Sequence, residues 1–207
     1  MRAKIIIGVV VAIVAVLGVA VFFFLRGPDL SAYERFREAA VIAMSAQKML
    51  VVEAAGSPEA VGGKAIKLLF GTYFKLDGVS KGPGMPAPRA RWPKGLNTPK
   101  EQWVGRYAMP VSDSLGALPK VDAEPGLSVK LDTWNYGEVV QILHVGPYDK
   151  ETPTIERLQA FIKSKGLEIA GDHEEEYLRG PTMFGKGNPE KYYTLIRYNV
   201  RQAGKTH

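Results

Sequence analysis

The run His173-Glu174-Glu175-Glu176-Tyr177 holds the side chains of this chain that are best suited to chemistry. Residues two apart in a strand point to the same face, so His173, Glu175 and Tyr177 share one face and the other two glutamates share the opposite face. If the first face is buried, Glu175 is a carboxylate that must either take up a proton or attract a cation. The run therefore predicts a counter-charge for a cationic ligand or a general acid/base. The alternative is a solvated surface strand.

Aromatic side chains elsewhere in the chain could form the walls of a ligand site, because their electron-rich faces attract organic cations. We expect Tyr148 and Tyr107 to line a ligand site, because Tyr148 follows a glycine turn and Tyr107 belongs to an Arg-Tyr pair that occurs twice. The further aromatic candidates are Tyr177, Trp134, Tyr136, Trp103 and Tyr193. Aromatic residues in strands more often belong to an ordinary core, and this alternative stands for each of them.

The histidines give no sign of a metal site. No pair among His144, His173 and His207 has the spacing of metal ligands, and the chain has no cysteine. His144 ends a predicted strand before a turn, where it either forms a structural hydrogen bond or borders the ligand site. We therefore expect no metal and no cofactor. A haem with His144 as its axial ligand is a minor variant, which visible absorbance would test.

Composition and motifs exclude several other functions. The net charge is +6, but lysines and arginines are dispersed among acidic residues, so we expect no nucleic-acid partner. The sequence contains neither a Gly-x-Ser-x-Gly elbow nor a phosphate-binding loop. Because 46% of the residues are apolar, the chain can bury a core and is expected to fold.

The first 27 residues are predicted to anchor the chain in a membrane. Residues 5–25 are an unbroken apolar run, and a helix of that length spans the hydrocarbon layer of roughly 30 Å. A cleaved signal peptide is the alternative, although its apolar region is usually shorter. Basic residues before the run slightly favour an extracytoplasmic location for the rest of the chain. The sequence thus predicts a single-pass membrane protein.

The remaining chain is predicted to be a short helical stalk and a duplicated α+β domain, residues 49–207. The stalk is placed at 28–48, because Ser31-Ala-Tyr-Glu34 has the form of a capping box. Two halves, about 49–118 and 127–201, follow the order strand, helix, strand, strand, with helices expected at 58–74 and 154–164. Neither half can bury both faces alone, so we expect them to pack together around a cleft.

Three motifs of the second half occur together in one known family. His144-Val-Gly-Pro-Tyr148 is similar to an H-x-G-P-Y signature, Glu175-x-Tyr177-Leu178 to an E-x-Y-L signature, and the segment 197–200 to a last strand. In these motifs the chain resembles the GyrI-like family, also called AraC-type effector-binding domains, over roughly 49–201. The resemblance implies a duplicated α+β module whose cleft binds amphipathic or cationic small molecules. Some stand-alone relatives resemble hydrolases. No DNA-binding helix-turn-helix is visible, so the regulator role does not carry over.

The sequence departs from the family at two positions. Many relatives carry a second acid near the position of Leu195, which is apolar here. In the first half, the segment 85–92 stands where Glu175 stands in the second half. We therefore expect an asymmetric cleft with at most one functional acid from these equivalent positions.

Three functions remain open from the sequence. The first is a membrane-anchored module that captures an amphipathic ligand in an aromatic cleft. If Glu175 is the counter-charge, this ligand is a cation. The second is a small-molecule hydrolase that uses Glu175 as acid/base, with Tyr177 or Tyr148 polarising the substrate. The third is a membrane-tethered scaffold that binds another protein. The sequence gives no indication of the oligomeric state.

Overall fold

The computed structural model describes residues 29–82, 84–93, 98–181 and 187–204. The chain divides into two compact units, Met1–Leu30 and Ser31–His207, and the second contains every element described below. The predicted membrane span, residues 5–25, lies outside the described ranges. Within them, no helix is long and apolar enough to cross a bilayer, and this finding contradicts the predicted single-pass membrane location.

The second unit is built on one antiparallel sheet of nine strands with two α-helices, so the predicted α+β class is confirmed. Along the sheet the strand order is β1-β6-β9-β8-β3-β4-β2-β5, and the short β7 also pairs with β9. The bounds are β1 Ala40–Met44, β2 Gln47–Ala55, α2 Pro58–Tyr73, β3 Arg89–Trp92, β4 Val104–Pro110, β5 Leu127–Trp134, β6 Gly137–Val145, α3 Thr152–Ser164, β7 Leu167–Ile169, β8 His173–Arg179 and β9 Tyr193–Gln202.

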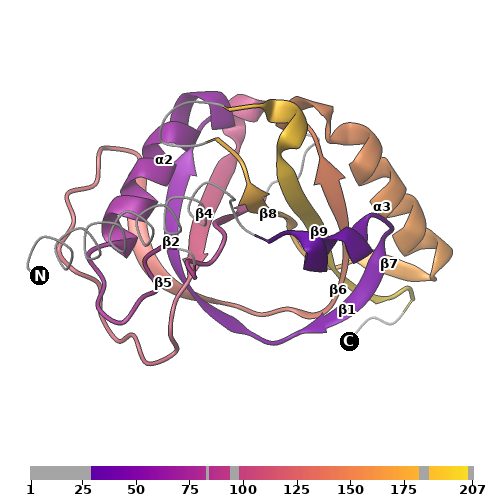
Figure 1. Cartoon of the computed structure of the whole chain (residues 1–207), viewed down its shortest axis with the longest axis horizontal. Coiled ribbons are helices and arrows are strands. Elements are labelled where there is room, and N and C mark those ends of the chain that lie inside the picture. The colour runs from indigo at the N-terminus through magenta and orange to yellow at the C-terminus, as the bar shows by residue number, and fades with distance from the viewer. Residues whose placement is uncertain (1–28, 83, 94–97, 182–186, 205–207) are drawn as a thin grey trace, which may run out of the picture. The chain divides into compact units, whose positions relative to one another are not determined.

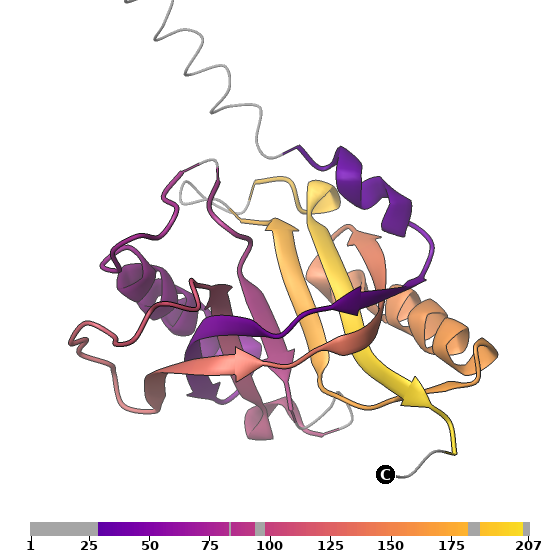
Figure 2. The ribbon, with the colours of Figure 1, turned by 90° about the horizontal axis from the view of Figure 1, so that it is seen from below.

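The strand order is symmetric about the middle of the sheet. The units β2-α2-β3-β4 and β6-α3-β8-β9 occupy equivalent places on the two sides of the β3–β8 pair, where the halves join. Each half also lends a strand to the other, because β1 pairs with β6 and β5 pairs with β2. Figure 2 shows these two continuous ribbons, β1 into β2 and β5 into β6, crossing the same face of the sheet.

Both helices cover the other face of the sheet, one on each half (Figure 1). Ala65 and Leu69 of α2 are buried with Val52, and Leu158 and Ile162 of α3 are buried with their half of the sheet. One register row places Val52, Tyr107, Ala90, Glu175 and Ile196 opposite one another across five strands, and hence on the helix-covered face. The predicted helices and their inward stripes are thereby confirmed.

A glycine with positive φ ends the first long strand of each half. Gly56 has φ 128° and Gly146 has φ 141°, a backbone conformation that residues with a Cβ rarely adopt. After Gly56, the side chain of Ser57 accepts a hydrogen bond from the backbone of Ala60 and Pro58 opens α2. In the first half the glycine turn thus leads directly from β2 to the helix that packs on it, and in the second half a short 3-10 helix, Tyr148–Lys150, comes between the glycine and α3.

The predicted helical stalk over 28–48 is wrong. Ser31–Phe36 forms only a short 3-10 helix, and the chain then enters β1 and β2. The carboxylate of Glu34 accepts a hydrogen bond of 2.8 Å from Arg37, so it is drawn towards the following residues. Pairing along β1 with β6 gives this segment a sheet ladder that local helix propensity does not outweigh.

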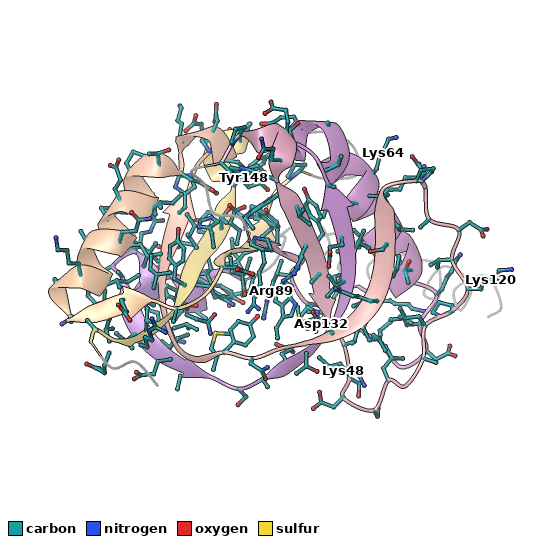
Figure 3. The ribbon with its side chains drawn as sticks, turned by 180° about the vertical axis from the view of Figure 1, so that it is seen from behind. Lys48, Lys64, Arg89, Lys120, Asp132 and Tyr148 are labelled. Atoms are coloured by element: carbon teal, nitrogen blue, oxygen red, sulfur yellow. The ribbon has the colours of Figure 1, made fainter. Side chains whose placement is uncertain are left out.

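On the face crossed by these ribbons, the joint between the halves carries a buried arginine–glutamate cluster. It consists of Arg89, Arg91, Arg197, Glu174 and Glu176. Arg197 binds both glutamates, at 3.1 Å to Glu174 and closer to Glu176, while Arg91 lies 2.7 Å from Glu174. Arg89, at the centre of Figure 3, also donates to Tyr136 over 2.8 Å. The two glutamates of β8 that face this side are therefore matched by arginines.

Candidate functional site

Glu175 lies on β8 at the joint between the halves, with its side chain 12% exposed. Each carboxylate oxygen has its own partner. The hydroxyl of Tyr177 donates to Oε2 over 2.5 Å, and Nε2 of His173 lies 2.8 Å from Oε1. These partners precede and follow Glu175 by two residues, as strand alternation predicts. The carboxylate is thereby held in one orientation on the helix-covered face.

His173 connects Glu175 to two further residues, Tyr198 on β9 and Glu151 at the start of α3. Nδ1 of His173 lies 2.8 Å from the hydroxyl of Tyr198 on β9. Glu151, directly before α3, is a buried residue with 6% exposure. One ring nitrogen of His173 and one carboxyl oxygen each of Glu151 and Glu175 lie within 4.8 Å of one another. A polar group of three ionisable side chains thus lies beneath the N-terminus of α3.

Aromatic rings pack around this polar group from both halves. Tyr148 contacts the ring of Tyr177 edge-on, with centroids 5.4 Å apart, and the ring of Tyr192 at 5.1 Å. From the first half, Trp92 on β3 contacts Tyr107 at 5.7 Å. Tyr148 remains 38% exposed and lies near the upper edge of the molecule in Figure 3. We call Glu151, His173, Glu175, Tyr177, Tyr148, Trp92 and Tyr107 the Glu175 site.

The two carboxyl groups of the site differ in their affinity for a proton. Burial and the neighbouring charge of Glu175 raise the pKa of Glu151 to about 9. Burial also acts to raise the pKa of Glu175, but the hydrogen bond and charge of His173, with hydrogen bonds from Tyr177 and Trp92, outweigh it and lower that pKa. Burial and the Glu175 charge raise the pKa of Tyr177 well above its usual value. Near neutral pH, the site therefore holds one ionised and one protonated carboxyl group.

Four predicted site residues come together in the structure: Glu175, Tyr177, Tyr148 and Tyr107. Ala90 of β3 is the register partner of both Tyr107 and Glu175, so the small side chain lies between them. Ala90, the first-half residue paired with Glu175, brings no acid to this point of the sheet. The second carboxyl group, Glu151, comes from the N-terminus of α3 instead.

His144 borders the site but is held in place by its own contacts. Its ring nitrogens lie 3.0 Å from Oγ1 of Thr154 and 3.1 Å from the backbone oxygen of Pro147. Burial lowers the pKa of His144, although Glu175 acts in the opposite direction. These contacts tie the end of β6 to the first turn of α3, which is the structural alternative that the sequence left open.

The other aromatic candidates lie away from Glu175. Trp134 and Tyr136 are buried on the opposite face, where the guanidinium of Arg91 lies 4.0 Å from the Trp134 ring. Tyr193 contacts the guanidinium of Arg179 at 5.4 Å. Trp103 packs on Trp92, with ring centroids 5.4 Å apart, on the first-half side of the site.

Sequence reasoning missed Glu151, Trp92 and Tyr198. Tyr198 was the repeat partner of Tyr107 in the second Arg-Tyr pair, and this equivalence already signals a residue beside the site. Glu151 follows the glycine turn by five residues, at a helix start where an acid has an ordinary capping role. Only the packing of α3 on the second half of the sheet shows that its side chain lies close to Glu175.

A separate cavity of about 260 Å³ lies along α2, away from the Glu175 site. Its lining includes Lys64 and Lys67 on the helix, Lys75 just after it, and Asp122 and Glu124 on the connector before β5. Lys64, labelled in Figure 3, pairs with Glu124 over 2.9 Å. The charges of this cavity are therefore mixed, and its best-placed lysine already has a partner.

The fold matches several solved structures. An uncharacterized conserved protein from Listeria innocua has a TM-score of 0.67 at 24% identity, and a hydrolase from Listeria innocua has 0.64 at 22%. Each match covers 84% of this chain and the whole of the other. The EcmrR C-terminal domain matches with a TM-score of 0.59 at 13% identity, over 80% of this chain and 98% of that one. No family model and no curated protein matches the sequence.

These likenesses establish a shared fold. At the level of the fold, they are consistent with the resemblance to GyrI-like domains that the second half shows in its motifs. At these identities, the ligand and chemistry must be argued from the residues of this chain.

Proposed function

We propose that this chain binds amphipathic organic cations at the Glu175 site, with the carboxylate of Glu175 as the counter-charge. The observation that carries the proposal is a contrast along one strand. Glu174 and Glu176 face arginines on one side of the sheet, whereas Glu175 faces the other side and, among the described residues, pairs with His173 and with no lysine or arginine. A buried carboxylate in this position favours a positive charge from outside the chain.

The aromatic rings of the site suit the apolar part of such a ligand. Tyr148, Tyr177, Trp92 and Tyr107 surround Glu175, and a cation over an aromatic face gains about 0.5–2 kcal/mol. The hydroxyl of Tyr107 is buried without a hydrogen-bond partner among the described residues, so it is available to a polar group of the ligand. An organic cation with flat apolar surfaces satisfies both the charge and the rings.

Tyr148 is the side chain that must move to admit a ligand. It contacts both Tyr177 and Tyr192, yet it is more than one-third exposed and belongs to the short 3-10 helix Tyr148–Lys150. A rotation of this ring would open the edge of the Glu175 site without changing the sheet. The rings of Trp92 and Tyr107 are buried in the core of the first half, and Tyr177 packs against that core.

A hydrolase is the second candidate, favoured by the presence of Glu151 beside Glu175. An acid–base mechanism requires one carboxyl group that gives a proton and one that accepts it, and the opposite pKa shifts provide this pair. One structural match is called a hydrolase, and the same fold is therefore compatible with such chemistry. Turnover that disappears in Glu151→Gln, while ligand binding persists, would favour this candidate over simple binding.

The experiment for the binding proposal compares two ions of nearly the same shape and opposite charge. Tetraphenylphosphonium and tetraphenylborate are added separately to the full chain, and thermal unfolding is recorded. A ligand at about 100 times its dissociation constant stabilises the fold by roughly 2.7 kcal/mol. We expect stabilisation by the phosphonium and not by the borate. Equal stabilisation by both ions would show apolar binding without a counter-charge and would contradict the proposal.

A further inference from the structure

Three potential metal ligands converge at the centre of the Glu175 site. One ring nitrogen of His173 and one oxygen each of Glu151 and Glu175 lie within 4.8 Å of one another, and Nε2 of His173 is 2.8 Å from Oε1 of Glu175. Ligand atoms on one tetrahedral ion lie about 3.3–3.6 Å apart, so a side-chain shift of about 1 Å would complete the geometry. The three residues come from β8 and from the start of α3, both well-packed elements of the second half.

Glu151 is buried with Thr194 as a polar neighbour, but one of its two carboxyl oxygens stays without a hydrogen bond in the described part of the chain. The residue is 6% exposed, and its Oε1 has no hydrogen-bond partner among the described residues. Buried polar atoms normally have a partner, because an unmet one costs free energy. This unpartnered oxygen belongs to the carboxylate whose ligand atom approaches His173 and Glu175, and a bound cation would satisfy it.

The ligands on β8 already have the outer contacts that metal ligands require. A histidine that binds through Nε2 usually uses Nδ1 for a hydrogen bond that fixes its ring, and Nδ1 of His173 lies 2.8 Å from the hydroxyl of Tyr198. The second oxygen of Glu175 accepts from Tyr177 over 2.5 Å, which leaves the first oxygen for coordination. Tyr198 and Tyr177 therefore act as positioning residues.

From this arrangement we propose that Glu151, His173 and Glu175 bind one zinc ion. One imidazole nitrogen and two carboxylate oxygens form a three-ligand set that zinc accepts, with its fourth position open to water or to a ligand. The ion displaces the proton from Glu151, and the two carboxylates then offset its double charge in this buried position. The ion replaces the hydrogen bond between His173 and Glu175. The sequence did not predict this site, because its ligands do not lie at a recognisable spacing.

The zinc proposal is independent of the proposed binding of organic cations, although the two share Glu175. Zinc requires Glu151 and His173 as ligands, whereas an organic cation requires the charge of Glu175 and the rings. A zinc ion would neutralise Glu175, so we expect zinc to weaken the binding of tetraphenylphosphonium. Each ion can be measured in the absence of the other, and failure of one proposal is therefore distinguishable from failure of the other.

The test is calorimetric titration of zinc into the full chain after removal of metal with a chelator, with cobalt as a spectroscopic probe. We expect one equivalent of zinc to bind and cobalt to give the intense visible bands of a low-coordinate site. Glu151→Gln should weaken zinc at least tenfold and abolish these bands. The control is Glu190→Gln, an exposed glutamate paired with Lys150, which should leave both readouts unchanged. Absence of stoichiometric binding, or equal affinity in Glu151→Gln, would overturn the proposal.

A second variant keeps the test informative if Glu151→Gln folds poorly. Tyr198→Phe removes the outer contact of His173 and retains the three ligands, and loss of such contacts typically lowers metal affinity about 10- to 100-fold. We expect weakened zinc binding and altered cobalt bands, with tetraphenylphosphonium bound as in the parent chain. Unchanged zinc affinity in this folded variant would show that His173 does not bind the ion.

Discussion

The hydroxyl of Tyr177 donates a hydrogen bond of 2.5 Å to the carboxylate of Glu175, two residues earlier on the same strand. Alternation along β8 places both side chains on the helix-covered face, and His173 completes the row from the other end. This row fixes the position of the carboxylate before any ligand arrives. Such fixed charges bind a ligand without a further ordering cost.

Removal of the Tyr177 hydroxyl should destabilise the fold measurably. Tyr177→Phe removes the 2.5 Å donor from a buried carboxylate, and the expected loss is about 1–3 kcal/mol in the free energy of unfolding. Urea titration followed by tryptophan fluorescence measures it. Tyr148→Phe is the control, because that hydroxyl forms no hydrogen bond with the described residues, and its change should stay within about 0.5 kcal/mol. Equal losses would show that the 2.5 Å contact does not hold Glu175.

The arginine–glutamate cluster should make Arg197 the most sensitive cation of the sheet. Arg197→Met leaves Glu174 and Glu176 with less than their full set of partners, and we expect a loss of about 3–5 kcal/mol. Arg201→Met, four residues further along β9, is the matched control. The ion pair of Arg201 with Glu168 is about half exposed and should contribute about 0–1 kcal/mol. Chemical unfolding compares the two. Similar losses would contradict the structural importance of the joint.

The lowered pKa of His144 predicts that the folded protein loses stability as the pH falls. Burial lowers its pKa in the folded protein, against an opposing effect of Glu175, so the unfolded chain binds a proton more readily. The stabilising contribution is present above the unfolded pKa of about 6.5 and is lost as the pH falls through the lower folded value. Melting temperatures from about pH 7.5 to about pH 5 should therefore fall more in the parent chain than in His144→Gln. Parallel curves would exclude this role.

Replacement of Gly105 and of Gly63 by alanine should change the stability of the fold in opposite directions. A Cβ at Gly105 would lie 2.7 Å from the ring of Tyr107 and 2.9 Å from that of Trp92, so Gly105→Ala must displace aromatic residues of the site. We expect it to cost about 1–3 kcal/mol. A Cβ at Gly63 on α2 meets nothing within 4 Å, and Gly63→Ala should stabilise the helix by about 0.5–1 kcal/mol. Thermal unfolding of both variants checks the pair, and the same sign in both would contradict the packing.

The parts of the fold that follow from local periodicity were predictable. Apolar residues three and four apart gave α2 and α3 to within two residues at each end, and alternation placed Glu175 with Tyr177 and His173. The repeated Arg-Tyr pair marked the two halves because each half must repeat the same buried pattern. These features depend on neighbours in sequence, which the sequence itself contains.

The remaining features depend on partners distant in the sequence. Residues 40–44 become a strand because β6 offers them a ladder, against the helix that the Ser31 capping pattern predicted. Trp134 lies on the opposite face because β5 pairs with β2 of the other half, an exchange that no local pattern encodes. Glu151 meets Glu175 only through the packing of α3. The candidate site was therefore half predictable, from β8 but not from α3.

The measurement that most directly tests the central claim is the affinity of tetraphenylphosphonium for the full chain and for Glu175→Gln, determined by calorimetry. Glu168→Gln, a change of the same kind at an exposed ion pair, serves as the control. We predict that Glu175→Gln weakens binding at least tenfold, or by about 1.4 kcal/mol, and that the control binds as the parent does. Equal affinity in all three proteins would contradict the assignment of Glu175 as the counter-charge.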